Sequence, residues 1–147
     1  MKLRRVRETD LPFVFECLIE LRGSASYGLE SFENYVREEG LLGAQNFQLW
    51  LAENSEGPIG ALTCNRFAMP RYLGYGLEIE ELVVHPKHQG RGYARQIIKC
   101  LLEELSKDCG LRKILVKTDD NVRATKVYAH FFKVTPMIVY QKHNRTL

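Results

Sequence analysis

Hydrophobic and polar positions along the chain repeat with two different periods, and the helical period marks three main segments. A first helix is predicted after a cap at Thr9 or Asp10, with its end at Gly23. A second helical stretch covers residues 32–39. The clearest helical face follows residue 93, where apolar side chains recur every three or four positions: Ala94, Ile97, Ile98, Leu101, Leu102 and Leu105.

Short apolar runs bounded by turn residues predict the strands. They cover residues 3–7, 47–52, 59–67, 77–84, 112–118 and 137–141. The turn ENSEGP joins the second and third strands as a hairpin, and residues 68–76 are predicted as a loop. A last helix starts at an Asn121 cap and turns an apolar face inward: Ala124, Val127, Tyr128 and Phe131. This order predicts one α/β domain over residues 1–147, a mixed central sheet flanked by about four helices.

Composition narrows the class of protein. The chain has 147 residues, 45% of them apolar, and a formal net charge of +3 without a long Lys/Arg block. Such a balance suits an anionic ligand and gives no sign of nucleic-acid binding. The four cysteines form no C-x-x-C pair, no His/Cys cluster suggests a metal, and no apolar run approaches membrane-spanning length. We therefore expect a cytoplasmic protein that binds no metal, nucleic acid or membrane.

The stretch VVHPKHQGRGYARQII, residues 83–98, changes from a strand to a helix through a turn with two glycines. Unpaired backbone amides at a helix start attract anions, and Gly90 and Gly92 let a phosphate approach the backbone closely. Arg91 and Arg95 add positive charge. A plain glycine turn before a surface helix is the alternative, but the flanking strand, helix and cations favour the anion site. Neither the dinucleotide fingerprint nor a Walker loop fits this turn.

The segment Gln89-Gly90-Arg91-Gly92-Tyr93-Ala94 resembles the Q/R-x-x-G-x-G/A motif of the GNAT superfamily of N-acetyltransferases. LEIEELVVHP and NVRATKVY resemble two further segments of that family. The resemblance implies that acetyl-coenzyme A is the acetyl donor. It also implies a set of coenzyme contacts, with the pantetheine arm on the strand and the phosphates on the turn: Leu82, Val83, Val84, Gln89, Gly90, Arg91, Gly92, Tyr93, Ala94, Arg95, Asn121 and Tyr128.

Acetyl transfer to an amine needs a group that accepts the amine proton and a donor for the departing thiolate. Glu78, Glu80 and Glu81 lie on the predicted strand 77–84. Strand alternation predicts Glu78 and Glu80 on the face of the residues at 82 and 84, with Glu81 opposite. From the resemblance we favour Glu80 as the base over Glu78, with Glu81 third. Tyr128 is implied as the acid, and a core tyrosine is the competing interpretation.

The chain departs from the family after Tyr128, where a glycine usually ends the helix and AHFFK follows here. The acceptor is expected to be the primary amine of a small molecule, and acids on the second helix and the strand favour a cationic one. A protein amino group is an open alternative, as is a domain that only senses acyl-coenzyme A. A homodimer through the last strands is common in the family, and the apolar TPMIVY segment allows it.

Overall fold

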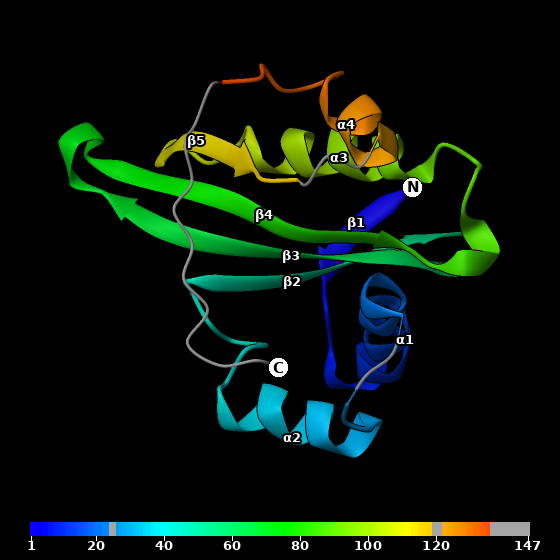
Figure 1. Ribbon diagram of the computed structural model, residues 1–147. Coiled ribbons are helices and arrows are strands. Elements are labelled where there is room, and N and C mark those ends of the chain that lie inside the picture. The colour runs from blue at the N-terminus through cyan, green and yellow to red at the C-terminus, as the bar shows by residue number, and fades with distance from the viewer. Residues whose placement is uncertain (24–25, 119–121, 136–147) are drawn as a thin grey trace.

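The computed structural model describes residues 1–23, 26–118 and 122–135. A mixed five-stranded sheet in the order β1-β2-β3-β4-β5 forms its centre (Figure 1). Its strands are β1 (Lys2–Arg5), β2 (Phe47–Asn54), β3 (Gly57–Met69), β4 (Gly74–Val84) and β5 (Leu111–Val116). The four helices are α1 (Leu11–Arg22), α2 (Leu29–Glu38), α3 (Tyr93–Leu105) and α4 (Val122–Tyr128). The predicted α/β fold with a mixed sheet and four helices is confirmed.

The first four strands are antiparallel neighbours, and only the β4–β5 pair is parallel. Helix α3 makes the crossover between these two parallel strands, as the sequence predicts. Helices α1 and α2 cover one face of the sheet, and α3 and α4 cover the other (Figure 1). The sheet therefore separates two hydrophobic clusters, one under each pair of helices.

The helix limits follow from local chemistry. Pro12 occupies the first turn of α1, where its missing N–H costs no hydrogen bond. Gly23 ends the helix at a φ of 72°, a left-handed conformation that glycine adopts without strain. In α3, the predicted apolar face is buried at Ile97, Ile98, Leu101 and Leu105.

The prediction of a loop over residues 68–76 is wrong for most of that segment. Strands β3 and β4 pair as far as Met69 and Gly74, which leaves only a short turn at residues 70–73. The glycines here serve the strand rather than a loop, because a side chain at Gly76 would clash with the Phe67 ring across the hairpin. The hairpin consequently projects as a long two-stranded arm (Figure 1).

Three predicted features concern residues that the structure does not describe. The last strand, 137–141, and the dimer surface expected there lie outside the described residues, as does Asn121. Helix α4 itself ends at Tyr128, and the Phe132 amide donates to the Tyr128 carbonyl at 2.9 Å. The chain thus leaves α4 through this turn, without a glycine.

Candidate active site

A bulge in β4 determines where the three strand glutamates lie. Thr63 of β3 pairs with Glu81 and the next residue, Cys64, pairs with Ile79, so Glu80 is one extra residue on β4. An extra residue reverses the alternation of side chains beyond it. Accordingly Leu77 and Ile79 are buried in the hydrophobic cluster under α3 and α4, and Leu82 and Val84 pack against the same cluster.

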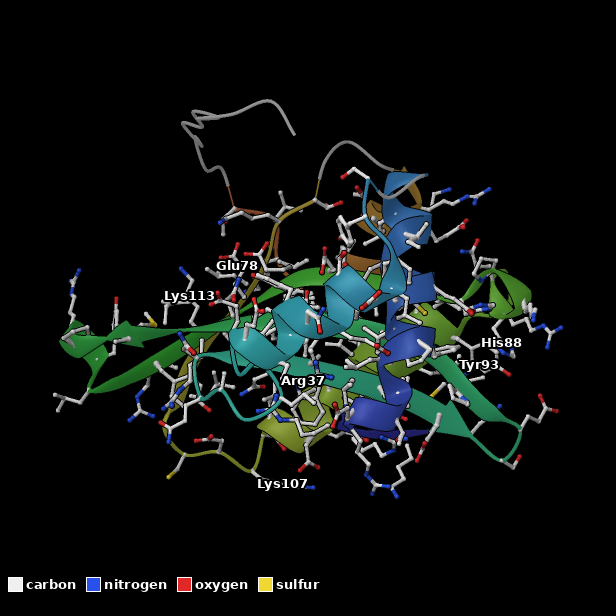
Figure 2. The ribbon with its side chains drawn as sticks, turned by 90° about the horizontal axis from the view of Figure 1, so that it is seen from below. Arg37, Glu78, His88, Tyr93, Lys107 and Lys113 are labelled. Carbon is white, nitrogen blue, oxygen red and sulfur yellow. The ribbon has the colours of Figure 1, made fainter. Side chains whose placement is uncertain are left out.

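The predicted division of the glutamates between the two faces is therefore wrong. Glu78 and Glu81 are next in sequence to residues whose side chains enter the α3/α4 cluster. Because successive side chains of a strand alternate, both glutamates point to the opposite face, which α1 and α2 cover. The Glu80 carboxylate reaches the same side, because it accepts a hydrogen bond from Asn65 at 2.9 Å. Figure 2 looks onto this face, with Glu78 labelled. Three carboxylates thus lie together on the face opposite Leu82 and Val84.

Each carboxylate has a partner on a neighbouring strand or just beyond one. Glu81 accepts a hydrogen bond from the Thr63 hydroxyl at 2.9 Å. The Glu78 carboxylate forms an ion pair with the Lys117 ammonium at 2.6 Å, and only 14% of its side chain is exposed. Glu80 is the exposed member of the three. Local sequence does not specify these partners, because the register that brings β3 and the end of β5 against β4 is a tertiary property.

Strand β4 extends beyond its partner β5, which leaves one edge of β4 without a strand. The two strands pair only from Tyr75 to Ile79 of β4, so among the described residues no strand lies beside 80–84 on that edge. The His85 amide donates to the Ile59 carbonyl at 2.9 Å, and bonding directions alternate along an antiparallel ladder. The backbone groups of Val83 hence point to β3, while those of Leu82 and Val84 point to the bare edge.

The glycine turn at the start of α3 has the geometry that an anion site requires. Gly90 and Gly92 both have a φ of 77°, and a side chain atom at either would meet nothing within 4 Å. The amides of residues 93–95 belong to the first turn of α3, so they have no partner within the helix. Arg91 and Arg95 are exposed beside these amides. Open space, unpaired amides and positive charge coincide at this turn.

One hydrogen bond connects the turn to the end of β4, and a ring contact connects the turn to the first residue of α3. The Gln89 side-chain amide donates a hydrogen bond to the Val84 carbonyl at 3.0 Å. This carbonyl faces the bare edge of β4, so the turn occupies an acceptor there. The His88 and Tyr93 rings pack edge to face at 6.2 Å, and both are labelled in Figure 2. Ala94 is half-buried just inside the helix. The hydrogen bond from Gln89 thus places the glycine turn in direct continuation of the bare strand edge.

Tyr128 lies on the other face of the sheet from the three glutamates. Its ring packs in the α3/α4 cluster and meets Phe132 edge to face at 6.2 Å. Burial, together with the nearby Cys64, raises the pKa of the Tyr128 hydroxyl. The phenol is therefore held in its protonated form, which is the form that can donate a proton.

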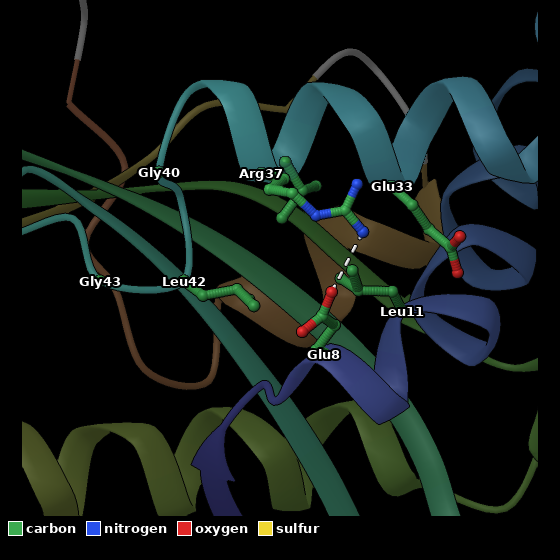
Figure 3. Close-up of a pocket in the computed structure, with 8 residues that line it drawn as sticks. Glu8, Leu11, Glu33, Arg37, Gly40, Leu42 and Gly43 are labelled. Atoms are coloured by element: carbon green, nitrogen blue, oxygen red, sulfur yellow. Dashed lines mark hydrogen bonds and ion pairs between the residues drawn. The ribbon is translucent and has the colours of Figure 1, made fainter.

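The cavity in Figure 3 is separate from this region. It has a volume of about 290 Å³ and lies between α2, the chain before α1 and residues 40–43. The exposed Arg37–Glu8 ion pair spans it at 3.1 Å, and no predicted site residue lines it. Within the described ranges, no group of three His, Cys, Asp or Glu side chains is placed to hold a metal, and no helix is long and apolar enough to span a bilayer.

The family model described as Acetyltransferase (GNAT) family matches residues 15–132. The chain belongs to this family of acetyltransferases, and it is accordingly an acyltransferase. Family members generally use acetyl-coenzyme A as the acetyl donor. Among curated proteins, none matches the sequence.

Solved structures support the fold assignment at low sequence identity. An aminoglycoside acetyltransferase from an uncultured soil metagenomic sample is 18% identical, with a TM-score of 0.76 over 99% of this chain and 96% of that one. A ribosomal-protein-alanine N-acetyltransferase from Brucella melitensis biovar Abortus 2308 is 14% identical, with a TM-score of 0.78 over 97% and 99%. A transcriptional regulator from Bacillus halodurans C-125 is 21% identical, with a TM-score of 0.73 over 97% and 99%. The fold is thus shared by proteins whose names differ widely.

Proposed function

We propose that this protein transfers the acetyl group of acetyl-coenzyme A to the primary amine of a small cationic molecule. The observation that carries the proposal is the continuity of the bare β4 edge with the glycine turn of α3. The pantetheine arm would hydrogen bond along the edge through Leu82 and Val84, since Val83 faces β3. The diphosphate would lie on the amides of residues 90–95, with Arg91 and Arg95 adding charge. Asn121 is a further proposed coenzyme contact.

In the proposed reaction the amine nitrogen attacks the thioester carbonyl carbon. The carbonyl oxygen gains negative charge, and the Leu82 N–H on the bare edge is placed to stabilise it. Glu80 accepts the amine proton, directly or through a water, because it is the exposed carboxylate of the three and bonds only to the neutral Asn65 among the described residues. As the C–S bond breaks, Tyr128 donates its proton to the thiolate.

The two sides of the sheet give the two substrates separate approaches. The three glutamates lie on the α1/α2 face, and Tyr128 lies on the α3/α4 face. We propose that the acceptor amine approaches from the face that carries the glutamates. The thioester would lie along the bare edge of β4, between the glutamates and Tyr128. Three carboxylates on that side favour a cationic acceptor. An acetyltransferase of this fold named for aminoglycosides, which are polycationic amines, is consistent with that choice.

A thiol-release assay with acetyl-coenzyme A and a panel of amines tests the proposal. We expect turnover with small di- or polyamines, and a loss of at least about a hundredfold in kcat for Glu80→Gln, the usual contribution of a general base. Tyr128→Phe should lower kcat with little change in the affinity for acetyl-coenzyme A. Release only with peptides that carry a free amino group would favour a protein substrate instead.

Coenzyme binding without thiol release on any amine would contradict the enzymatic proposal and favour an acyl-coenzyme A sensor. An unchanged rate and pH profile in Glu80→Gln would remove that residue from the base role. We also propose a cytoplasmic location. The four cysteines are free in the structure, which suits a reducing compartment.

A further inference from the structure

Lys117 lies immediately after β5 and reaches across to β4. Its ammonium is 2.6 Å from the Glu78 carboxylate, which is 14% exposed, whereas the Lys117 side chain is 55% exposed. Glu78 is therefore the more buried partner of the ion pair. Because β5 ends at Val116, Lys117 is positioned where the chain leaves the sheet beside the bare β4 edge.

The charges on this face explain why a cation is needed there. Glu78, Glu80 and Glu81 lie within four consecutive positions of one bulged strand, so their carboxylates repel one another. Within the described parts of the chain, Lys117 is the cation in ion-pair contact with this cluster, and its pKa is raised by Glu78 first and also by Glu80. Lys113 projects from the same face of β5, four positions earlier, without such a contact (Figure 2).

The helices packed on this face bring no competing charge into the core. Helix α2 contributes the buried apolar side chains Phe32 and Val36. Helix α1 contributes the buried Cys17, and burial raises the pKa of that thiol to about 12, so the thiol is neutral at working pH. Glu16 of α1 contacts His85 instead, at 3.3 Å. Among the described residues, Lys117 is thus the cationic side chain that pairs with a carboxylate of this group.

We propose that Lys117 is a positioning residue for acetyl transfer: it holds Glu78 in an ion pair and thereby leaves the exposed Glu80 as the carboxylate that takes the amine proton. This inference rests on the proposed function. Lys117 contacts neither the amine nor the thioester in this scheme. It acts by neutralising one of three adjacent negative charges, which lessens the repulsion on the carboxylate beside it.

The pH profile of kcat/KM tests this role. A base must be deprotonated to act, so kcat/KM falls as pH drops through its pKa, and loss of a nearby cation moves that limb to higher pH. We expect Lys117→Met to move the acid limb up by about one pH unit, the lower end of the effect of an adjacent charge. At pH values below the acid limb, kcat/KM of Lys117→Met should then be about tenfold lower than that of the native protein. At pH values above the limb, the two should be nearly equal. Lys117→Arg should restore the native profile.

Two matched variants separate this role from a structural one. Lys113→Met removes a cation from the same strand face without an ion pair and should leave the limb in place. In the Lys117→Met background, Glu78→Gln removes the unpaired charge and should return the limb toward its native position. An equal loss of rate at every pH in Lys117→Met, or an equal displacement in Lys113→Met, would overturn the proposal.

The experiment also distinguishes this inference from the proposed function. If Glu80→Gln abolishes turnover while the Lys117→Met profile matches the native one, the acetyltransferase proposal stands and the role of Lys117 fails. If no amine supports thiol release in the native protein, the proposed function fails first. In that case the pKa of Glu78, followed by NMR in both proteins, still reports the Lys117 effect. A pKa of Glu78 that is the same with and without Lys117 would refute the ion pair itself.

Discussion

Substitution of Gly92 by alanine separates an anion-binding turn from a simple helix cap. Gly92 precedes α3 with a φ of 77°, a conformation that costs an L-residue about 1–2 kcal/mol. Alanine recovers about 0.4–1 kcal/mol by restricting the unfolded chain. The net loss of unfolding free energy is therefore about 1 kcal/mol, or about 4 °C in Tm for a domain of this size. Nothing lies within 4 Å of the added Cβ, so no clash adds to this loss.

The effect on coenzyme binding should be larger than this stability loss. If the turn holds a diphosphate, the new Cβ projects into the space that the anion occupies, and a distorted turn misaligns the amides of α3. Losing one hydrogen bond to a charged group costs about 1.5–3 kcal/mol. Because 1.4 kcal/mol corresponds to about tenfold in Kd, we expect acetyl-coenzyme A to bind at least about tenfold more weakly. Calorimetric titration of the folded variant measures this directly.

Gly23 provides a matched control for the strain. It ends α1 at a φ of 72°, and a Cβ there also meets nothing within 4 Å, but no coenzyme contact is proposed for it. Gly23→Ala should lower Tm by a similar amount and leave the affinity for acetyl-coenzyme A unchanged. A Gly92→Ala protein that loses stability yet binds the coenzyme as tightly as the native chain would refute the anion-site reasoning and leave only a helix cap.

Two further predictions concern the long hairpin. Gly76→Ala should displace the Phe67 ring, which a Cβ would strike, and lower stability by about 1–3 kcal/mol in urea unfolding; an unchanged midpoint would contradict that packing. Burial and the hydrogen bond to Asp108 raise the pKa of Tyr75 from 10.0 to about 12, so its neutral form is favoured in the folded state. Its contribution is complete below pH 10.0 and is lost as pH rises toward 12, and Tyr75→Phe should flatten that alkaline decline in unfolding free energy.

Periodicity predicts most of the elements because local patterns reflect which face of each element is buried. The α3 segment illustrates this, since its apolar residues recur at the spacing that one helical face requires. The same logic fails for residues 68–76, because their local sequence, with two glycines and a proline, predicts a loop. In the folded protein Gly74 and Gly76 lie in β4, and Gly76 gives the Phe67 ring of the facing strand its space. That requirement depends on the pairing partner, which local sequence does not specify.

The sequence by itself determined the order of the described elements, the glycine turn before α3 and the membership of the acetyltransferase family, because these depend on residues close together in the chain. Only the tertiary structure decided which way the strand glutamates point. Their direction depends on a one-residue bulge at Glu80, and a single extra residue in a strand of period two reverses every side chain beyond it. The same holds for Lys117, whose partner Glu78 lies on another strand and meets it only when β5 aligns with β4.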